Sequence, residues 1–117
     1  MKGFDHVIEP SFEEAFRKDH DLKGKWHSEW FGNSNPIILE LGCGKGEYTV
    51  SMASRWPEKN FIGIDIKGAR MWRGARESHR MKLPNAAFLR TRIEFTGSFF
   101  APGEIDEIWL TFPDLSL

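Results

Sequence analysis

Three glycines at alternate positions directly follow an aliphatic run between Ile37 and Gly46. The run Ile-Ile-Leu-Glu-Leu leads into Gly-Cys-Gly-Lys-Gly, so that Gly42, Gly44 and Gly46 alternate with larger residues. Glycine tolerates positive φ and lacks a Cβ, so backbone N–H groups can approach a ligand closely, and a helix beginning behind them adds partial positive charge. This order is typical of the first strand, turn and helix of a nucleotide-type Rossmann fold, although an αβ turn that binds nothing shares it.

A carboxylate ends the next aliphatic run, Phe61-Ile-Gly-Ile-Asp65. Asp65 stands about 20 residues beyond Gly46, the offset at which an acid at the end of the second strand meets ribose hydroxyls. A carboxylate accepts two hydrogen bonds, which suits a vicinal diol. The alternative role is an N-cap for the helix that follows, and one residue can serve both purposes.

The elements that position these residues alternate along the chain and predict an α/β fold. In an open parallel sheet the ligand crevice lies outside the carboxyl ends of the strands, so polar residues at those ends converge on one site. The patterns predict strands over 37–41, 61–65, 86–91 and 107–112 and helices over 47–56 and 67–80. The strand ends then present Glu40 with the glycines, Asp65, Arg92 with Glu94, and Asp114.

Both predicted helices carry an apolar face. In the first, we expect the core stripe to consist of Tyr48, Met52, Ala53 and Trp56. In the second, one arc holds Gly68, Met71, Trp72, Ala75 and His79, and the other holds Arg70, Arg73, Arg76 and Arg80. Residues 1–35 are interpreted as an extension of two short helices, and residues 36–117 as the Rossmann-like domain.

Composition limits the remaining choices. A chain of 117 residues is one domain or less, and its 16 basic against 17 acidic residues give no general attraction for nucleic acid. The basic residues cluster locally instead, because residues 67–92 hold eight Lys and Arg and the single acid Glu77. That bias favours phosphate contact, although a solvated helix face remains the alternative.

Cys43 is the only cysteine, and no segment resembles a signal peptide or membrane span, so we expect a soluble cytoplasmic protein without a disulfide.

The sequence resembles the bacterial tRNA (guanine-N7)-methyltransferases, class I enzymes that use S-adenosylmethionine. Four segments carry the resemblance, and together with the intervening residues it extends over about residues 22–114. They are Leu39-Glu-Leu-Gly-Cys-Gly-Lys-Gly46, Phe61-Ile-Gly-Ile-Asp65, Phe88-Leu-Arg-Thr-Arg-Ile-Glu94 and Phe100-Ala-Pro-Gly-Glu-Ile-Asp-Glu-Ile-Trp-Leu-Thr-Phe-Pro-Asp114. The glycine pattern marks any methyltransferase of this class, whereas the fourth segment is specific to the family.

The resemblance implies a role for each matching position. Glu40 and the glycines Gly42, Gly44 and Gly46 would hold the methionine part of S-adenosylmethionine, and Asp65 its ribose. The segment Arg92-Ile93-Glu94 would contact the adenine, through either Arg92 or Glu94. Asp114 matches the active-site aspartate of the family, tRNA is the implied partner, and no metal is expected.

The chain departs from the family pattern after Asp114. The family continues with Pro and Trp, a basic segment and three further strands, whereas this sequence reads Leu-Ser-Leu117. We therefore expect the N-terminal half of the fold, truncated after the fourth strand, with an open sheet edge that favours self-association. A non-catalytic, self-associating fragment is the alternative function. An NAD-dependent oxidoreductase fits less well, because its third glycine would stand where this chain has Glu47.

Overall fold

The fold is a five-stranded parallel sheet with helices on both faces. The computed structural model describes residues 7–10, 19–44, 46–66 and 68–110, and for residues 68–70 the backbone alone. The strand order is β1-β4-β3-β2-β5. The strands are β1 (Val7–Ile8), β2 (Ile37–Leu41), β3 (Asn60–Asp65), β4 (Ala86–Arg90) and β5 (Glu107–Leu110).

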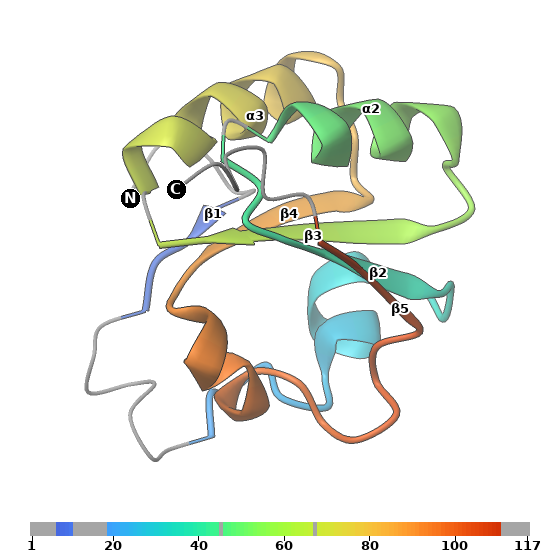
Figure 1. Ribbon diagram of the computed structural model, residues 1–117. Helices are drawn as coiled ribbons and strands as arrows, with labels where there is room; N and C mark the ends of the chain where they lie inside the picture. The colour runs from blue at the N-terminus through green and yellow to red at the C-terminus, as the bar shows by residue number, and fades with distance from the viewer. Residues whose placement is uncertain (1–6, 11–18, 45, 67, 111–117) are drawn as a thin grey trace.

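The two α-helices lie together on one face of the sheet, and two shorter helices lie on the other (Figure 1). The α-helices are α2 (Glu47–Arg55) and α3 (Gly68–Arg80), and the shorter ones are the π-helix η1 (Trp26–Phe31) and the 3-10 helix η2 (Ile93–Ser98). Because both faces are covered, the central strands are continuous apolar runs, as is usual for parallel sheets. The predicted α/β architecture with parallel strands is therefore confirmed.

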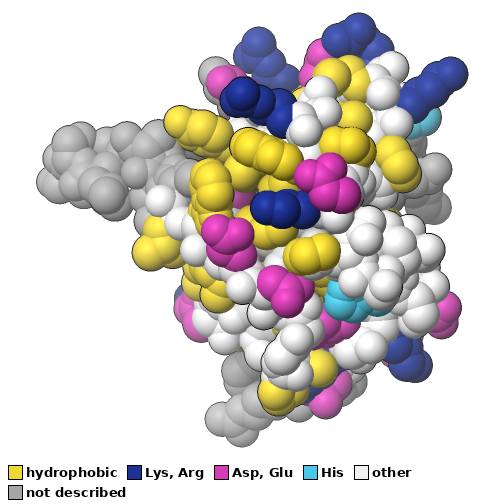
Figure 2. All heavy atoms as spheres, turned by 90° about the vertical axis from the view of Figure 1, so that its right-hand side faces the viewer, with side chains coloured by type: hydrophobic (Ala, Val, Ile, Leu, Met, Phe, Trp, Pro, Cys, Tyr) yellow, Lys and Arg dark blue, Asp and Glu magenta, His cyan; other side chains and the backbone are white. Residues whose placement is uncertain are grey.

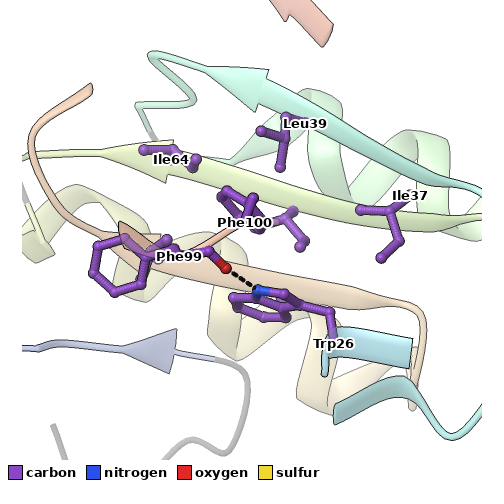
Figure 3. Packing of buried hydrophobic residues seen from close by; sticks show 9 residues of the cluster. Trp26, Ile37, Leu39, Ile64, Phe99 and Phe100 are labelled. Carbon is purple, nitrogen blue, oxygen red and sulfur yellow. Dashed lines mark hydrogen bonds between the residues drawn. The ribbon is translucent and has the colours of Figure 1, made fainter. Parts of the chain in front are cut away.

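Trp26 anchors the layer beneath the sheet. Its side chain is fully buried, its Nε1–H donates to the backbone oxygen of Phe99 at 2.7 Å, and its ring stacks on Phe100 with centroids 5.3 Å apart (Figure 3). Ile37 and Leu39 of β2 pack into the same cluster. The segment around Trp26 is thus part of the main hydrophobic core.

A buried carboxylate fastens this layer. The two oxygens of Glu104 accept hydrogen bonds from the backbone N–H groups of Gly24 at 2.8 Å, Trp26 at 3.1 Å and Ala101 at 2.9 Å. Backbone donors in a turn would otherwise be buried without partners, which is costly. Glu104 therefore joins the N-terminal segment to the loop that leads into β5.

Three expectations about the helices and the N-terminal segment are wrong. The interpretation of residues 1–35 as an extension of two short helices is wrong at Val7–Ile8, which form β1 and pair with β4, whereas η1 lies where the second short helix was expected. A two-residue strand is too short to show a period of two, which explains the error. Residues 11–18, where the first predicted helix falls, lie outside the described residues.

The other two errors concern predicted core residues. On α2, Tyr48 is 62% exposed and Trp56 is 38% exposed, while Thr49, Val50, Met52 and Ala53 are buried. The Trp56 ring is covered in part by cations, with the Arg55 guanidinium 5.4 Å from its centroid. On α3, Met71 and Ala75 are buried as expected, but His79 is exposed, whereas Ser78 beside it is fully buried. No helix within the described ranges has the length and apolarity to cross a membrane.

Candidate functional site at the carboxyl ends of the strands

The glycine turn is held directly against the end of β3. Gly42, Gly44 and Gly46 have φ values of 76°, 57° and 78°, in the left-handed region that favours glycine. The N–H groups of Gly42 and Cys43 both donate to the backbone oxygen of Ile64, at 2.8 and 3.0 Å. The turn therefore bends back over the neighbouring strand, and α2 begins directly behind it.

Asp65 is joined to this turn. Its Oδ2 accepts a hydrogen bond from the Gly44 N–H at 2.8 Å, and its backbone oxygen accepts one from Thr91 at 3.1 Å. The first bond is charge-assisted, which makes it stronger than one between neutral groups. The predicted acid and the predicted turn thus form one unit, although they lie 21 residues apart in sequence.

Glu40 points into the protein. Its residue is only 3% exposed, and its carboxylate accepts a hydrogen bond from the hydroxyl of Thr49 on α2. Gly63 of β3 leaves the space for this contact, because a Cβ there would lie 2.7 Å from the Thr49 Oγ1. The observed contact of Glu40 therefore fixes α2 on the sheet, and its contact with a cofactor stays a prediction.

Gly46 is required by packing as well as by its φ. A Cβ at this position would lie 2.5 Å from Cε1 of Phe88 on β4 and 3.3 Å from Cα of Gly74 on α3. Real Cβ atoms essentially never approach another atom as closely as the first distance, and the second is tighter than most real Cβ contacts. The third glycine therefore lets the start of α2 settle between the sheet and α3.

The predicted adenine segment lies at the next strand end and is exposed. Arg92 and Glu94 form an ion pair at 2.8 Å, and Ile93 is 37% exposed. The pKa of Glu94 lies below its usual value, because its carboxylate accepts a hydrogen bond from its own backbone N–H and then one from Arg92. Arg92 and Glu94 thus neutralise each other, and Ile93 offers apolar surface beside them.

Ile66 is a candidate that sequence reasoning missed. It follows Asp65 directly, is 51% exposed, and its backbone oxygen accepts a hydrogen bond from Nε of Arg90 at 3.1 Å. The signal was present in the sequence, because an aliphatic residue stands where the chain leaves the sheet for solvent. Ile66 and Ile93 flank the ends of the neighbouring strands β3 and β4.

Asp114 lies outside the described residues. The last described residue of β5, Leu110, pairs with Leu41, which directly precedes the glycine turn. The carboxyl end of β5 therefore lies at the same end of the sheet as Asp65 and the turn. The role of Asp114 stays a prediction.

A groove of about 540 Å³ runs between α2 and α3, behind the glycine turn. Small residues such as Ser51 and Gly74 line it, with Arg55 and Arg73 among its charged groups. Of the predicted cofactor residues it includes Gly46 alone. This groove is therefore distinct from the strand-end site.

Comparison with known proteins places the chain among methyltransferases. A protein-family model described as "Putative methyltransferase" matches residues 34–114. The tRNA (guanine-N(7)-)-methyltransferase of Bacteroides fragilis is 56% identical over 114 residues, which are 97% of this chain and 45% of that protein. The protein of the same name from Christiangramia forsetii is 58% identical over 111 residues, or 95% of this chain and 50% of that one. The chain thus spans about half the length of these curated relatives.

Solved structures agree on the fold. A crystal structure of WbdD superimposes with a TM-score of 0.56 at 26% identity, covering 69% of this chain and 18% of that one. The structure of PKMT2 from Rickettsia typhi in complex with AdoHcy also gives 0.56, at 22% identity, covering 69% of this chain and 16% of that one. At these identities the likeness shows a Rossmann-like α/β fold.

Proposed function

This chain belongs to the methyltransferase family whose model matches it, and from that premise we propose that its strand-end site binds S-adenosylmethionine for methylation of guanine N7 in tRNA by the whole protein. The observation that carries the proposal is the hydrogen bond between the Gly44 N–H and Asp65. It joins a glycine turn and a strand-end carboxylate, which are the two elements that a nucleoside-type cofactor needs. The names of the similar Bacteroides and Christiangramia proteins support the substrate.

The residues at this edge suit the cofactor in chemical type. The Asp65 carboxylate would accept hydrogen bonds from the ribose hydroxyls, and the apolar side chains of Ile66 and Ile93 would contact the flat adenine. Arg92 or Glu94 would supply the polar adenine contact. Both partners of that ion pair are exposed and accessible to a ligand.

The methionine part would lie against the glycine turn. The positive φ values of Gly42 and Gly44 shape that turn, and the N-terminus of α2 behind it favours a carboxylate. Glu40 would contribute to this site indirectly, because its hydrogen bond with Thr49 holds α2 in position. S-adenosylmethionine, when bound, supplies a methyl group on a positively charged sulfur.

The proposed reaction needs few catalytic side chains. Guanine N7 has a free lone pair, so no base must remove a proton before it attacks the methyl carbon. Positive charge moves to the purine during transfer, and a fixed carboxylate beside the base stabilises that charge. We assign this role, together with orientation of the guanine, to Asp114.

The arginines of α3 would contact tRNA phosphates. Arg73, Arg76 and Arg80 are exposed on the outer face of the helix, and Arg80 is paired with Glu77. Arg70 belongs to the same predicted arc, but its side chain is not described. Each phosphate contact would make binding more dependent on salt, and a tRNA substrate would place the protein in the cytoplasm.

A chimera tests the proposal. This chain would replace the matching half of the Bacteroides fragilis relative, and methyl transfer from labelled S-adenosylmethionine to a tRNA transcript would be measured. We expect 7-methylguanosine in the digested tRNA and no transfer to a transcript made with 7-deazaguanosine. The chimera carrying Asp114→Asn should lose most of the activity while still binding the cofactor.

Either of two results would contradict the proposal. A folded chimera that methylates neither transcript would show that this segment does not support methyl transfer. Equal transfer to the 7-deaza transcript would exclude N7 as the acceptor. Full activity of the Asp114→Asn chimera would refute only the role assigned to Asp114 and would leave the rest of the proposal standing.

A further inference from the structure

Arg90 connects three neighbouring strand ends at the edge of the sheet that carries the proposed cofactor site. It is the last residue of β4 and is the register partner of Asp65, the last residue of β3. Its Nε donates a hydrogen bond to the backbone oxygen of Ile66 at 3.1 Å. Its Nη1 forms an ion pair with Oε2 of Glu9, just beyond β1, at 3.2 Å. One guanidinium group therefore joins the ends of β3, β4 and β1.

The charged residues at these strand ends lie on the α3 face of the sheet. Phe88, two residues before Arg90, belongs to the same buried cluster as Met71 of α3. Because side chains alternate along a strand, Arg90 points to that face as well. Asp65 shares the face as its register partner, and the ion pair places Glu9 there too. An acid, a base and an acid thus follow one another across three strand ends.

Two successive peptide groups are fixed where the chain leaves β3. The backbone oxygen of Asp65 accepts a hydrogen bond from the Thr91 N–H at 3.1 Å, and the next backbone oxygen, that of Ile66, accepts the one from Arg90. The Asp65 carboxylate in turn accepts the Gly44 N–H at 2.8 Å. The backbone that carries this carboxylate is therefore held from β4, and its side chain is held by the glycine turn.

Arg90 differs in its setting from the arginines of the helices. Figure 2 shows Lys and Arg side chains projecting from the upper part of the molecule, where Figure 1 draws α2 and α3. Arg90 is instead at a strand end, with 51% of its side chain exposed and with acceptors on two sides. A guanidinium is planar and presents its donors in a rigid fork, so it can hold two acceptors in a fixed geometry. This arrangement suits a positioning role.

We propose that Arg90 is a positioning residue for the Asp65 carboxylate, acting through its hydrogen bond to the Ile66 backbone oxygen and its ion pair with Glu9. The N-terminal strand β1 thereby supports the proposed cofactor site. The cofactor itself would contact Asp65, and Arg90 acts through that residue. The consequence for cofactor binding rests on the proposed function, whereas the orientation of Asp65 can be measured without a cofactor.

The contacts of Arg90 should matter more for binding than for stability. Exposed ion pairs contribute little to the stability of a fold. Ordering the backbone of one residue, by contrast, changes an equilibrium constant by about five- to thirtyfold. Thr91 still holds the neighbouring peptide group, so we expect Arg90→Ala to weaken S-adenosylhomocysteine binding by about five- to tenfold. The midpoint of urea unfolding should stay nearly unchanged.

Amide hydrogen exchange followed by NMR tests the orientation of Asp65 without a cofactor. Gly44 N–H donates to the Asp65 carboxylate, whereas Gly42 N–H in the same turn donates to the backbone oxygen of Ile64. Arg90→Ala should speed exchange of the Gly44 amide by about fivefold or more and leave that of Gly42 within about twofold. An unchanged rate at Gly44, or an equal increase at Gly42, would overturn the proposal.

Two conservative variants separate the contacts of Arg90. Arg90→Lys keeps a positive charge near Glu9 but lacks the planar fork, so its effect on the Gly44 amide should equal that of Arg90→Ala within about twofold. Glu9→Gln leaves the hydrogen bond to Ile66 in place and should have a smaller effect. If Arg90→Lys behaved like the original chain, charge alone would explain the effect and the positioning role would be overturned.

Calorimetry with S-adenosylhomocysteine, on samples shown to be folded by circular dichroism, tests the consequence for binding. Lys23→Ala is the control, because it removes the ion pair with Asp19 and should leave the affinity unchanged. In an Asp65→Ala background, Arg90→Ala should add less than about twofold, since the carboxylate that it positions is gone. A loss of equal size in both backgrounds would overturn the proposal. A folded original chain that does not bind S-adenosylhomocysteine would contradict the proposed function, and the exchange rates would still decide the role of Arg90.

Discussion

Replacing Gly46 by alanine should destabilise the fold through two separable effects. The first is backbone strain, because φ is 78° and an L-residue in the left-handed region loses about 1–2 kcal/mol. The second is overpacking, because the new Cβ would lie 2.5 Å from the Phe88 ring, and forcing a group into a packed core costs about 1–3 kcal/mol. We therefore expect Gly46→Ala to lower the free energy of unfolding by about 2–5 kcal/mol, a large part of the 5–15 kcal/mol typical of a domain.

Gly103 offers a matched control for this variant. Its φ is 79°, nearly that of Gly46, but a Cβ there would meet nothing within 4 Å. Gly103→Ala should therefore lose only the strain component, about 1–2 kcal/mol. Urea unfolding followed by tryptophan fluorescence gives both free energies. Equal losses in the two variants would refute the argument, because they would mean that Phe88 yields without cost and that the close approach of the turn does not constrain the fold.

Three further predictions concern carboxylates. Asp65→Ala should weaken S-adenosylhomocysteine binding at least tenfold in calorimetry while far-UV circular dichroism stays unchanged. Glu104→Gln should lower the free energy of unfolding by about 1–3 kcal/mol in urea, because an amide cannot accept all the backbone hydrogen bonds that the carboxylate accepts. The pKa of Glu94 is lower in the folded protein than its ordinary value of 4.5. The hydrogen bonds of its carboxylate therefore stabilise the fold fully above pH 4.5, and this stabilisation is lost as the pH falls through the lowered pKa. Arg92→Ala should raise that pKa yet leave it below 4.5 in an NMR titration, because the backbone hydrogen bond remains.

Hydrophobic patterns predicted the central elements well. The aliphatic run over β2 and the acid at the end of β3 located the turn, the sheet and the edge at which a ligand would bind. The reason is physical, since strands buried on both faces must be continuously apolar and their polar residues gather at the ends. Ile66 could have been found by the same reasoning, from an apolar residue placed beyond a strand end.

Periodicity could not predict what covers each helix face. Tyr48 and Trp56 share a stripe with Met52, but only Met52 is buried. A stripe shows which residues face one way and does not show where the sheet ends. The role of Trp26 was equally hidden, because its burial depends on Phe99 and Phe100, more than 70 residues later in the chain.

Binding of S-adenosylmethionine to the 117-residue chain is the most direct test of the proposed strand-end site. Isothermal titration would be performed with S-adenosylmethionine and, for comparison, with NAD, on samples shown to be folded. We predict saturable binding of S-adenosylmethionine at one site, much weaker binding by Asp65→Ala, and no saturable binding of NAD. A folded chain that binds NAD instead, or binds S-adenosylmethionine equally well without the Asp65 carboxylate, would contradict it.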